Sequence, residues 1–267
     1  QNVFVLTSFN PGSGKSFLTM NIAMSFAIKK KRILIIDGDL RHGSISSDID
    51  SPKIGLSDYL GNRIENWREI IVPYKEYANL HIIPIGTVPP NPTELLEDGK
   101  LAALITALRP EYDYIFIDCP PSLELLTLNA LTASDTVLVP IQCEYYALEG
   151  IADLMRSIKM CNKRLNPELS VQGIVMTMYD GRTKLSDQVV NEVRKFFGKK
   201  VYKTMIPRNV RLSEAPSHRT PAIAYDKESK GARAYLHLAG ELIKREEKAA
   251  KAAQEAAASA AKEAEHG

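Results

Sequence analysis

The sequence is poor in residues that build disulfide or transition-metal sites: its 267 residues include 3 cysteines, 5 histidines and 1 tryptophan. Cys119, Cys143 and Cys161 are not arranged in a CxxC pair. Such an odd, unpatterned count argues against a disulfide framework and a zinc site. The histidines are scattered without ligand spacing, which predicts no transition-metal centre.

Long hydrophobic runs and a large net charge are also missing. No stretch approaches the length that crosses a bilayer, and the opening segment QNVFVLTSF has the pattern of a strand and not of a signal peptide. We therefore expect a cytoplasmic protein without membrane insertion. The formal charge of +2 gives no strong overall field, so nucleic-acid binding can be argued only from local clusters.

Short apolar runs alternate along the chain with longer helical patterns. Runs such as ILIID and YIFID are apolar throughout, which is typical of parallel strands covered on both faces. The pattern predicts a doubly wound α/β fold with a mostly parallel sheet and helices on both faces. We expect strands at Val3–Thr7, Arg32–Asp37, Leu80–Ile85, Tyr114–Asp118, Thr136–Ile141, Val171–Thr177 and Val201–Met205, and helices at about Lys15–Lys30, Thr93–Leu108, Leu123–Ala133, Ala147–Leu165, Ser186–Phe197 and Gly231–Arg245.

The strongest motif is a glycine-rich turn that follows the first strand and opens the first helix, with the sequence NPGSGKS. Backbone N–H groups of such a turn point at phosphate oxygens. Lys15 is expected to reach the β and γ phosphates of a nucleotide, and the Ser16 hydroxyl to bind Mg²⁺. This strand–loop–helix context predicts a phosphate-binding loop, formed by Pro11, Gly12, Ser13, Gly14, Lys15, Ser16 and Phe17.

Three carboxylates follow apolar strands. Asp37 and Asp39 end the second strand, and Asp118 ends YIFID. In open α/β sheets ligands bind at these strand ends. One acid of the first pair can hold Mg²⁺ through water while the other orients the attacking group, and Asp118 has the position of a Walker B residue. We predict Ser16, Asp39 and Asp118 as magnesium ligands, and Lys15, Asp37 and Asp39 as catalytic residues.

Together these motifs resemble the branch of P-loop ATPases that contains ParA, MinD and the bacterial tyrosine kinases. Residues 1–121 are most similar to the tyrosine kinases, in TSFNPGSGKS, IDGDLR, GLSDYL and YDYIFIDCPP. Residues 122–245 are most similar to chromosomal ParA of the Soj type, in VYKTMIPRNVRLSEAPSH and YDKESKGARAYLHLAGELI. The resemblance implies that Asp39 activates the attacking water, that Asp118 supports magnesium, and that Pro207, Arg208 and Asn209 line the adenine pocket.

The resemblance also implies an ATP-dependent homodimer that binds DNA without sequence preference on the nucleoid, and a ParB-like activator. ParA relatives carry a signature lysine that reaches the partner's nucleotide, and here that position is Asn10. Phe9 likewise replaces the usual first glycine of the loop. Two alternatives stay open: a tyrosine kinase, although no tyrosine follows Tyr235, and a nucleotide-dependent binding module with negligible turnover.

Basic residues concentrate between residues 180 and 234, where 13 Lys and Arg face 6 Asp and Glu. That local balance of +7 leaves the rest of the chain at −5, an asymmetry suited to binding phosphate backbones. With the ParA-like match of the same segment, it predicts DNA binding by Arg194, Lys195, Arg219, Lys227 and Lys230. A solvated basic face is the alternative.

The chain changes character near residue 245. Residues 246–267 are mostly Ala with Lys and Glu, and Ala has the highest helix propensity. We expect one ATPase domain over residues 1–245, without an internal linker, followed by a helical or disordered tail.

Overall fold

A seven-stranded sheet forms the centre of the computed structural model, which describes residues 2–49, 53–75, 77–92, 94–96, 98–121, 125–145 and 147–265. The strand order is β3-β4-β2-β5-β1-β6-β7. Only the β3–β4 pair is antiparallel. The strands are β1 (Val3–Leu6), β2 (Ile33–Asp37), β3 (Val72–Tyr74), β4 (Tyr77–Ile83), β5 (Tyr114–Asp118), β6 (Thr136–Gln142) and β7 (Ser170–Thr177). The predicted fold class is confirmed.

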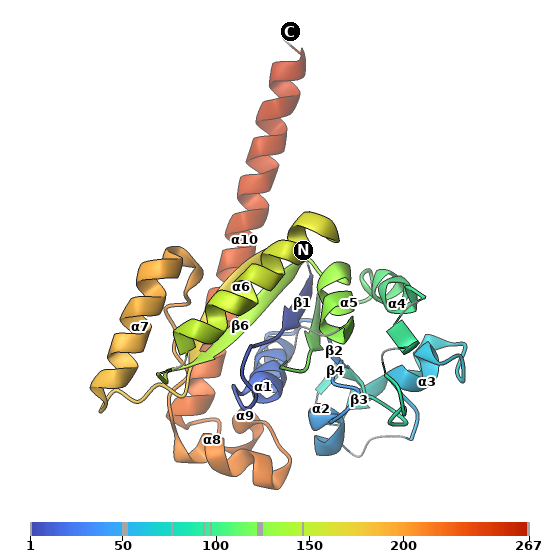
Figure 1. The fold of residues 1–267 in the computed structure, drawn as a ribbon, viewed down its shortest axis with the longest axis horizontal. Helices are drawn as coiled ribbons and strands as arrows, with labels where there is room; N and C mark the ends of the chain where they lie inside the picture. Colours follow the sequence, from blue (N-terminus) through green and yellow to red (C-terminus); the bar gives the residue numbers. More distant parts are fainter. Residues whose placement is uncertain are drawn as a thin grey trace.

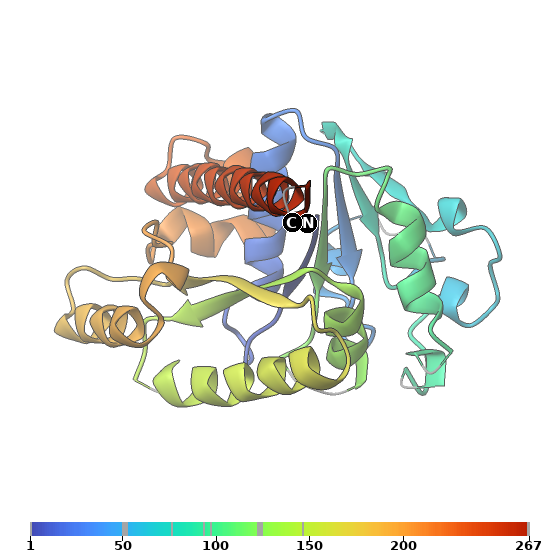
Figure 2. The same cartoon turned by 90° about the horizontal axis from the view of Figure 1, so that it is seen from above.

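Helices cover both faces of the sheet (Figure 1). The α-helices are α1 (Lys15–Ile28), α2 (Ser44–Asp48), α3 (Leu56–Leu60), α4 (Lys100–Leu108), α5 (Leu125–Ala133), α6 (Ala147–Arg164), α7 (Lys184–Phe197), α8 (Val210–Glu214), α9 (Ala222–Tyr225) and α10 (Lys230–Glu265). Short 3₁₀ helices are η1 (Trp67–Ile70), η2 (Glu94–Leu96), η3 (Gly198–Lys200) and η4 (Ala215–His218). Helices α1 and α10 lie side by side on one face, opposite α4, α5 and α6 (Figure 2).

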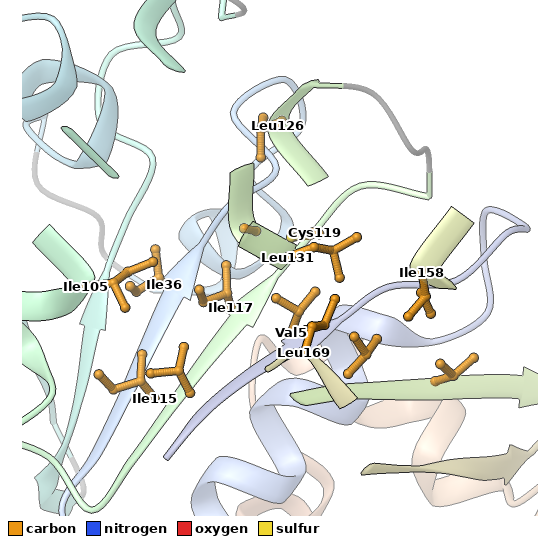
Figure 3. Close-up of a cluster of buried hydrophobic side chains, with 14 of the residues drawn as sticks. Val5, Ile36, Ile105, Ile115, Ile117, Cys119, Leu126, Leu131, Ile158 and Leu169 are labelled. Atoms are coloured by element: carbon orange, nitrogen blue, oxygen red, sulfur yellow. The ribbon is translucent and has the colours of Figure 1, made fainter. Parts of the chain in front are cut away.

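Alternate residues of each central strand enter different cores, because successive side chains point to opposite faces. Phe4 and Phe116 pack under α1 and α10, where the Phe116 ring contacts those of Phe4 and Phe26. Val5 and Ile117 point to the other face, toward α5 and α6 (Figure 3). Both faces are therefore buried, which accounts for the uninterrupted apolar strands.

The expected strand at Val201–Met205 is wrong. Val201 forms an isolated bridge with Ile174 of β7, but the amides of Lys203 and Thr204 donate to the carboxylate of Glu241 on α10. A ladder cannot continue once its amides bind elsewhere. The sequence analysis missed β3, an antiparallel edge strand that contains Pro73, because proline weakens the strand pattern and is tolerated at edges.

The helix expected at Thr93–Leu108 is shorter than predicted. The structure has η2 and then α4, and Gly99 between them takes a left-handed φ of 73°. Thr93 lies outside the described residues, as does Leu123, the expected start of the helix that the structure describes from Leu125.

Helix α10 continues past residue 245 without a break and projects from the body (Figure 1). Its last fully buried side chain is Leu242, and the described side chains from Glu247 onward are exposed. The projecting part therefore depends on helix propensity and not on packing. No described helix is long and apolar enough to span a membrane.

Because α10 has a buried part and a projecting part, we expect changes in the two parts to have unequal effects on the free energy of unfolding. Leu238→Ala removes a buried side chain from the α1–α10 core and should lower the free energy of unfolding by about 2–5 kcal/mol. Ending the chain after Lys248 removes turns whose described side chains are exposed, and should change the free energy of unfolding by less than about 0.5 kcal/mol. Urea denaturation followed by circular dichroism compares the two variants. A large loss on truncation would show that the projecting turns stabilise the body.

Candidate nucleotide and magnesium site

The phosphate-binding loop connects β1 to α1 at the carboxyl edge of the sheet. Gly12 and Gly14 take φ values of 71° and 81°, in the left-handed region that favours glycine. A Cβ on either would meet no atom within 4 Å, so both backbones face open space. An anion can thus approach the loop amides and the start of α1 closely.

Hydrogen bonds fix the shape of the loop. The Ser13 and Ser8 hydroxyls donate to the Asn10 carbonyl oxygen at 2.5 and 2.8 Å. From the end of β6, Gln142 Nε2 donates to the Gly12 carbonyl oxygen at 2.6 Å. The carbonyls are thereby turned into the protein, which leaves the loop amides for a ligand.

Lys15 is buried, and its Nζ donates to Ser8 Oγ at 3.2 Å. Burial lowers the pKa of Lys15, while Asp118 and Asp39 act in the opposite direction. Lys15 lines the cleft beside the phosphate loop, and an ammonium group there can form charge-assisted hydrogen bonds with phosphate oxygens. Its predicted role stays a prediction.

Asp118 and Asp37 end adjacent strands and are register partners between β5 and β2. Ser16 Oγ donates to Asp118 Oδ2 at 2.5 Å, and Thr19 Oγ1 donates to Oδ1 at 3.1 Å. Burial, and then the Asp37 charge, raise the pKa of Asp118 to about 7. Two buried carboxylates so close together favour the binding of a cation.

Asp37 does not line the cleft. It is fully buried, and its Oδ2 accepts from the backbone N and the hydroxyl of Ser46 at 2.8 and 2.7 Å. Burial raises the pKa of Asp37 to about 6. These contacts make Asp37 the anchor of α2, and its predicted catalytic role stays a prediction.

Asp39 lies at the surface of the cleft. Its Oδ1 accepts from the backbone N of Arg41 and of His42, and also contacts His42 Nδ1 at 3.3 Å. These contacts hold the carboxylate, which lines the same cleft as the phosphate loop. The sequence analysis missed His42, Thr19 and Ser46; the spacing of Ser16 and Thr19 on one helix face was the available signal for Thr19.

One cleft of about 370 Å³ brings most of the predicted site together. Its lining includes Pro11, Gly12, Gly14, Lys15, Ser16, Phe17, Asp39, His42, Ser44, Cys119 and Pro121. Ser13 faces away, into a neighbouring cavity beside β6 and α6. All three cysteines are unpaired and buried, including Cys119 in this cleft.

The expected adenine-pocket residues do not line this cleft. Pro207 bridges to Tyr179 beyond the end of β7, and the Asn209 side chain caps α8 by accepting from Arg211 N. Arg208 pairs with Glu144 at 3.4 Å. Their role in binding adenine stays a prediction.

Four of the five predicted DNA-binding residues form two groups, and Arg219, which follows η4, belongs to neither. Arg194 and Lys195 lie in the last turn of α7, whereas Lys227 lies just before α10 and Lys230 begins it. Arg245 of α10 donates to the carbonyls of Lys200 and Val201, at the end of the η3 helix that follows α7. Because Lys230 precedes Arg245 by 15 residues, about 22 Å of helix separates the groups.

The oxygen donors that the structure brings together fit magnesium. The Ser16 hydroxyl contacts the Asp118 carboxylate, and hard divalent cations prefer such oxygen ligands. Asp39 lines the same cleft as Ser16, and the role of all three as magnesium ligands stays a prediction. The described residues hold no group of three or more His, Cys, Asp or Glu side chains that could bind a metal without a nucleotide. This arrangement suits an ion that is shared with phosphate oxygens.

Comparison with known proteins agrees with this geometry. Residues 1–171 match a family model described as an AAA domain. The chain is 42% identical to the sporulation initiation inhibitor Soj of Bacillus subtilis over 251 residues, which cover 90% of this chain and 97% of Soj. The chain belongs to the ParA/Soj family of P-loop ATPases. It is also 42% identical to ParA of Myxococcus xanthus, over 91% of this chain and 88% of that protein.

The alignment with Soj spans both parts of the chain, including the part that resembles tyrosine kinases. The kinase alternative itself stays a prediction. Among solved structures, MinD of Pyrococcus horikoshii with Mg-ADP superimposes with a TM-score of 0.76 at 25% identity, over 90% of this chain and 95% of MinD. The prediction of an adenine nucleotide and Mg²⁺ as cofactors is confirmed.

The raised pKa of Asp118 predicts a stabilising substitution. Its ionised form destabilises the nucleotide-free fold at neutral pH, because the folded pKa of about 7 exceeds that of an exposed Asp. Asp118→Asn should therefore raise the free energy of unfolding by on the order of 2 kcal/mol at pH 8, and by less at pH 5.

The same variant should lose the part of ATP affinity that depends on Mg²⁺. Chemical denaturation and calorimetry measure the two effects, and Asp113→Asn, at the half-buried position directly before the same strand, is the control. A destabilised Asp118→Asn protein at pH 8 would contradict this account of the buried charges.

Proposed function

We propose that this protein is a partition ATPase whose ATP-bound homodimer holds DNA without sequence preference and releases it after hydrolysis. The Ser16–Asp118 contact beside the buried Lys15 carries the nucleotide part of this proposal. The similarity to ParA and Soj proteins, which are described as chromosome partitioning and sporulation proteins, supports the biological role.

The site residues have different roles in binding the nucleotide, and the charge of each residue determines its role. The amides of the phosphate loop and the Lys15 ammonium bind the phosphate oxygens. Ser16 and Asp118 would hold Mg²⁺, which supplies positive charge for the γ-phosphate as negative charge develops on it. These groups are fixed before the nucleotide arrives, so little reorganisation is needed during the reaction.

Asp39 is the residue placed to orient the attacking water. Its Oδ1 is occupied by Arg41 N and by His42, and no described residue donates a hydrogen bond to Oδ2. Oδ2 can therefore accept a hydrogen bond from water in the cleft and take its proton. Asp37 contributes by holding α2 through Ser46.

Unpaired cations support the DNA-binding part of the proposal. Within the basic segment, Arg182, Arg208, Arg211 and Arg233 form ion pairs with acids. The five predicted DNA-binding residues form no ion pair with any described residue. Their charges remain available for phosphates, and a dimer would present them twice. A ParB-like protein would stimulate hydrolysis.

DNA retention should depend on these cations and on ATP. With ATP and Mg²⁺, we expect Arg194→Ala to weaken binding of a 30-base-pair duplex about threefold to tenfold and to reduce the salt dependence. Lys15→Ala should abolish the effect of ATP. The control is Arg156→Ala on α6, which removes the same charge from an arginine paired with Asp153. Equal losses in Arg194→Ala and Arg156→Ala would mean that net charge, and not this surface, determines binding.

The residue at position 10 should set the rate of hydrolysis. Asn10→Lys restores the cation that ParA relatives direct at the partner's nucleotide, and added positive charge at a transferring phosphate accelerates its transfer. We expect phosphate release to rise at least about tenfold, and only at concentrations where the protein dimerises. Asn10→Gln controls for side-chain size. A rate that is independent of protein concentration would argue against a contribution across the dimer.

A further inference from the structure

A large apolar side chain is exposed at the end of α7. Phe196 is 69% exposed, although its neighbour Phe197 packs against the core. The sequence analysis assigned the aromatic residues to packing, and Phe196 does not fit that assignment. A single exposed apolar side chain is ordinary on a protein surface, so only the residues near Phe196 can indicate a ligand.

Cations lie close to Phe196 along the chain, two before it on α7 and two after it in η3. We define the α7 patch as Arg194, Lys195, Phe196, Lys199 and Lys200, all of which are exposed. Within the described residues, none of its four cations forms an ion pair. Glu192 lies one helical turn before Phe196 and is the nearby acid on α7.

Local helix energetics explain only part of this composition. Arg194 and Lys195 in the last turn of α7 interact favourably with the helix dipole. That effect gives no reason for an exposed phenyl ring. A ring within a cationic surface is complementary to a ligand that offers both an apolar face and phosphates, and unpaired nucleobases have this chemistry.

We propose that the α7 patch binds single-stranded DNA, with Phe196 stacked on a base and the four cations holding the flanking phosphates; this rests on the DNA binding proposed above. In a duplex the bases are already stacked, and opening a step costs free energy. The cations therefore strengthen the binding of a duplex, whereas the Phe196 ring adds little to it. The second cationic group, at Lys227 and Lys230, lacks an exposed aromatic residue among its neighbours in the described chain.

The first test compares two DNA forms with the full chain. Fluorescence anisotropy with labelled oligo(dT) and with a duplex of equal length is measured in ATP and Mg²⁺. Phe196→Ala should weaken oligo(dT) binding about tenfold and duplex binding less than about twofold. Arg194→Ala should weaken both. Met160→Ala, on α6 and 54% exposed, is the matched control and should change neither.

A second measurement detects the contact directly. In a Trp67→Phe background, which removes the single tryptophan, Phe196→Trp provides an indole at the patch. Oligo(dT) should quench its emission, because a base stacks on it. Met160→Trp in the same background should show no quenching.

The outcomes separate this inference from the proposed function. If the wild-type protein binds neither DNA form, the proposed DNA binding fails. If it binds duplex but Phe196→Ala affects both forms equally or neither, only the single-strand inference is overturned. Binding to vesicles of anionic phosphatidylglycerol that is lost in Phe196→Ala, with oligo(dT) binding unchanged, would also overturn it and assign the patch to a membrane surface.

Discussion

The site depends on two buried carboxylates at the ends of neighbouring strands, which parallel pairing holds in register. Parallel pairing of β2 with β5 places Asp37 and Asp118 side by side, and burial raises the pKa of each. The surrounding hydroxyls each bind one of them: Ser16 and Thr19 bind Asp118, and Ser46 binds Asp37. The two carboxylates thus concentrate negative charge at the strand ends, which a bound Mg²⁺ would offset.

Hydrogen bonds connect these buried carboxylates, and through them the phosphate loop, to more distant elements. Ser46 receives a hydrogen bond from Ile85 N, beyond the end of β4, while it donates to Asp37. Ile85 O in turn accepts from Ser57 N at the start of α3. Asp37, α2 and the start of α3 are thereby joined by one continuous series of hydrogen bonds.

The sequence predicted the elements whose signal is local. A glycine-rich turn between a strand and a helix defines the phosphate loop, and buried strands that end in Asp define the acids. It could not predict that Glu241 would take the amides of Lys203 and Thr204, because that contact joins distant segments. The division of the basic residues into two groups likewise depends on where α7 ends relative to α10. The number of charges along the sequence gives no information on the distance between the two groups in the folded protein.

The burial of every cysteine has a practical consequence for spectroscopy. Desolvation raises the pKa of the Cys119 and Cys143 thiols, so little reactive thiolate forms at neutral pH. A single cysteine introduced at the exposed Lys251 would then accept a maleimide dye selectively, without removal of the native thiols. Because α10 is one continuous helix there, the dye would follow the rotation of the whole body and report assembly in single-particle experiments.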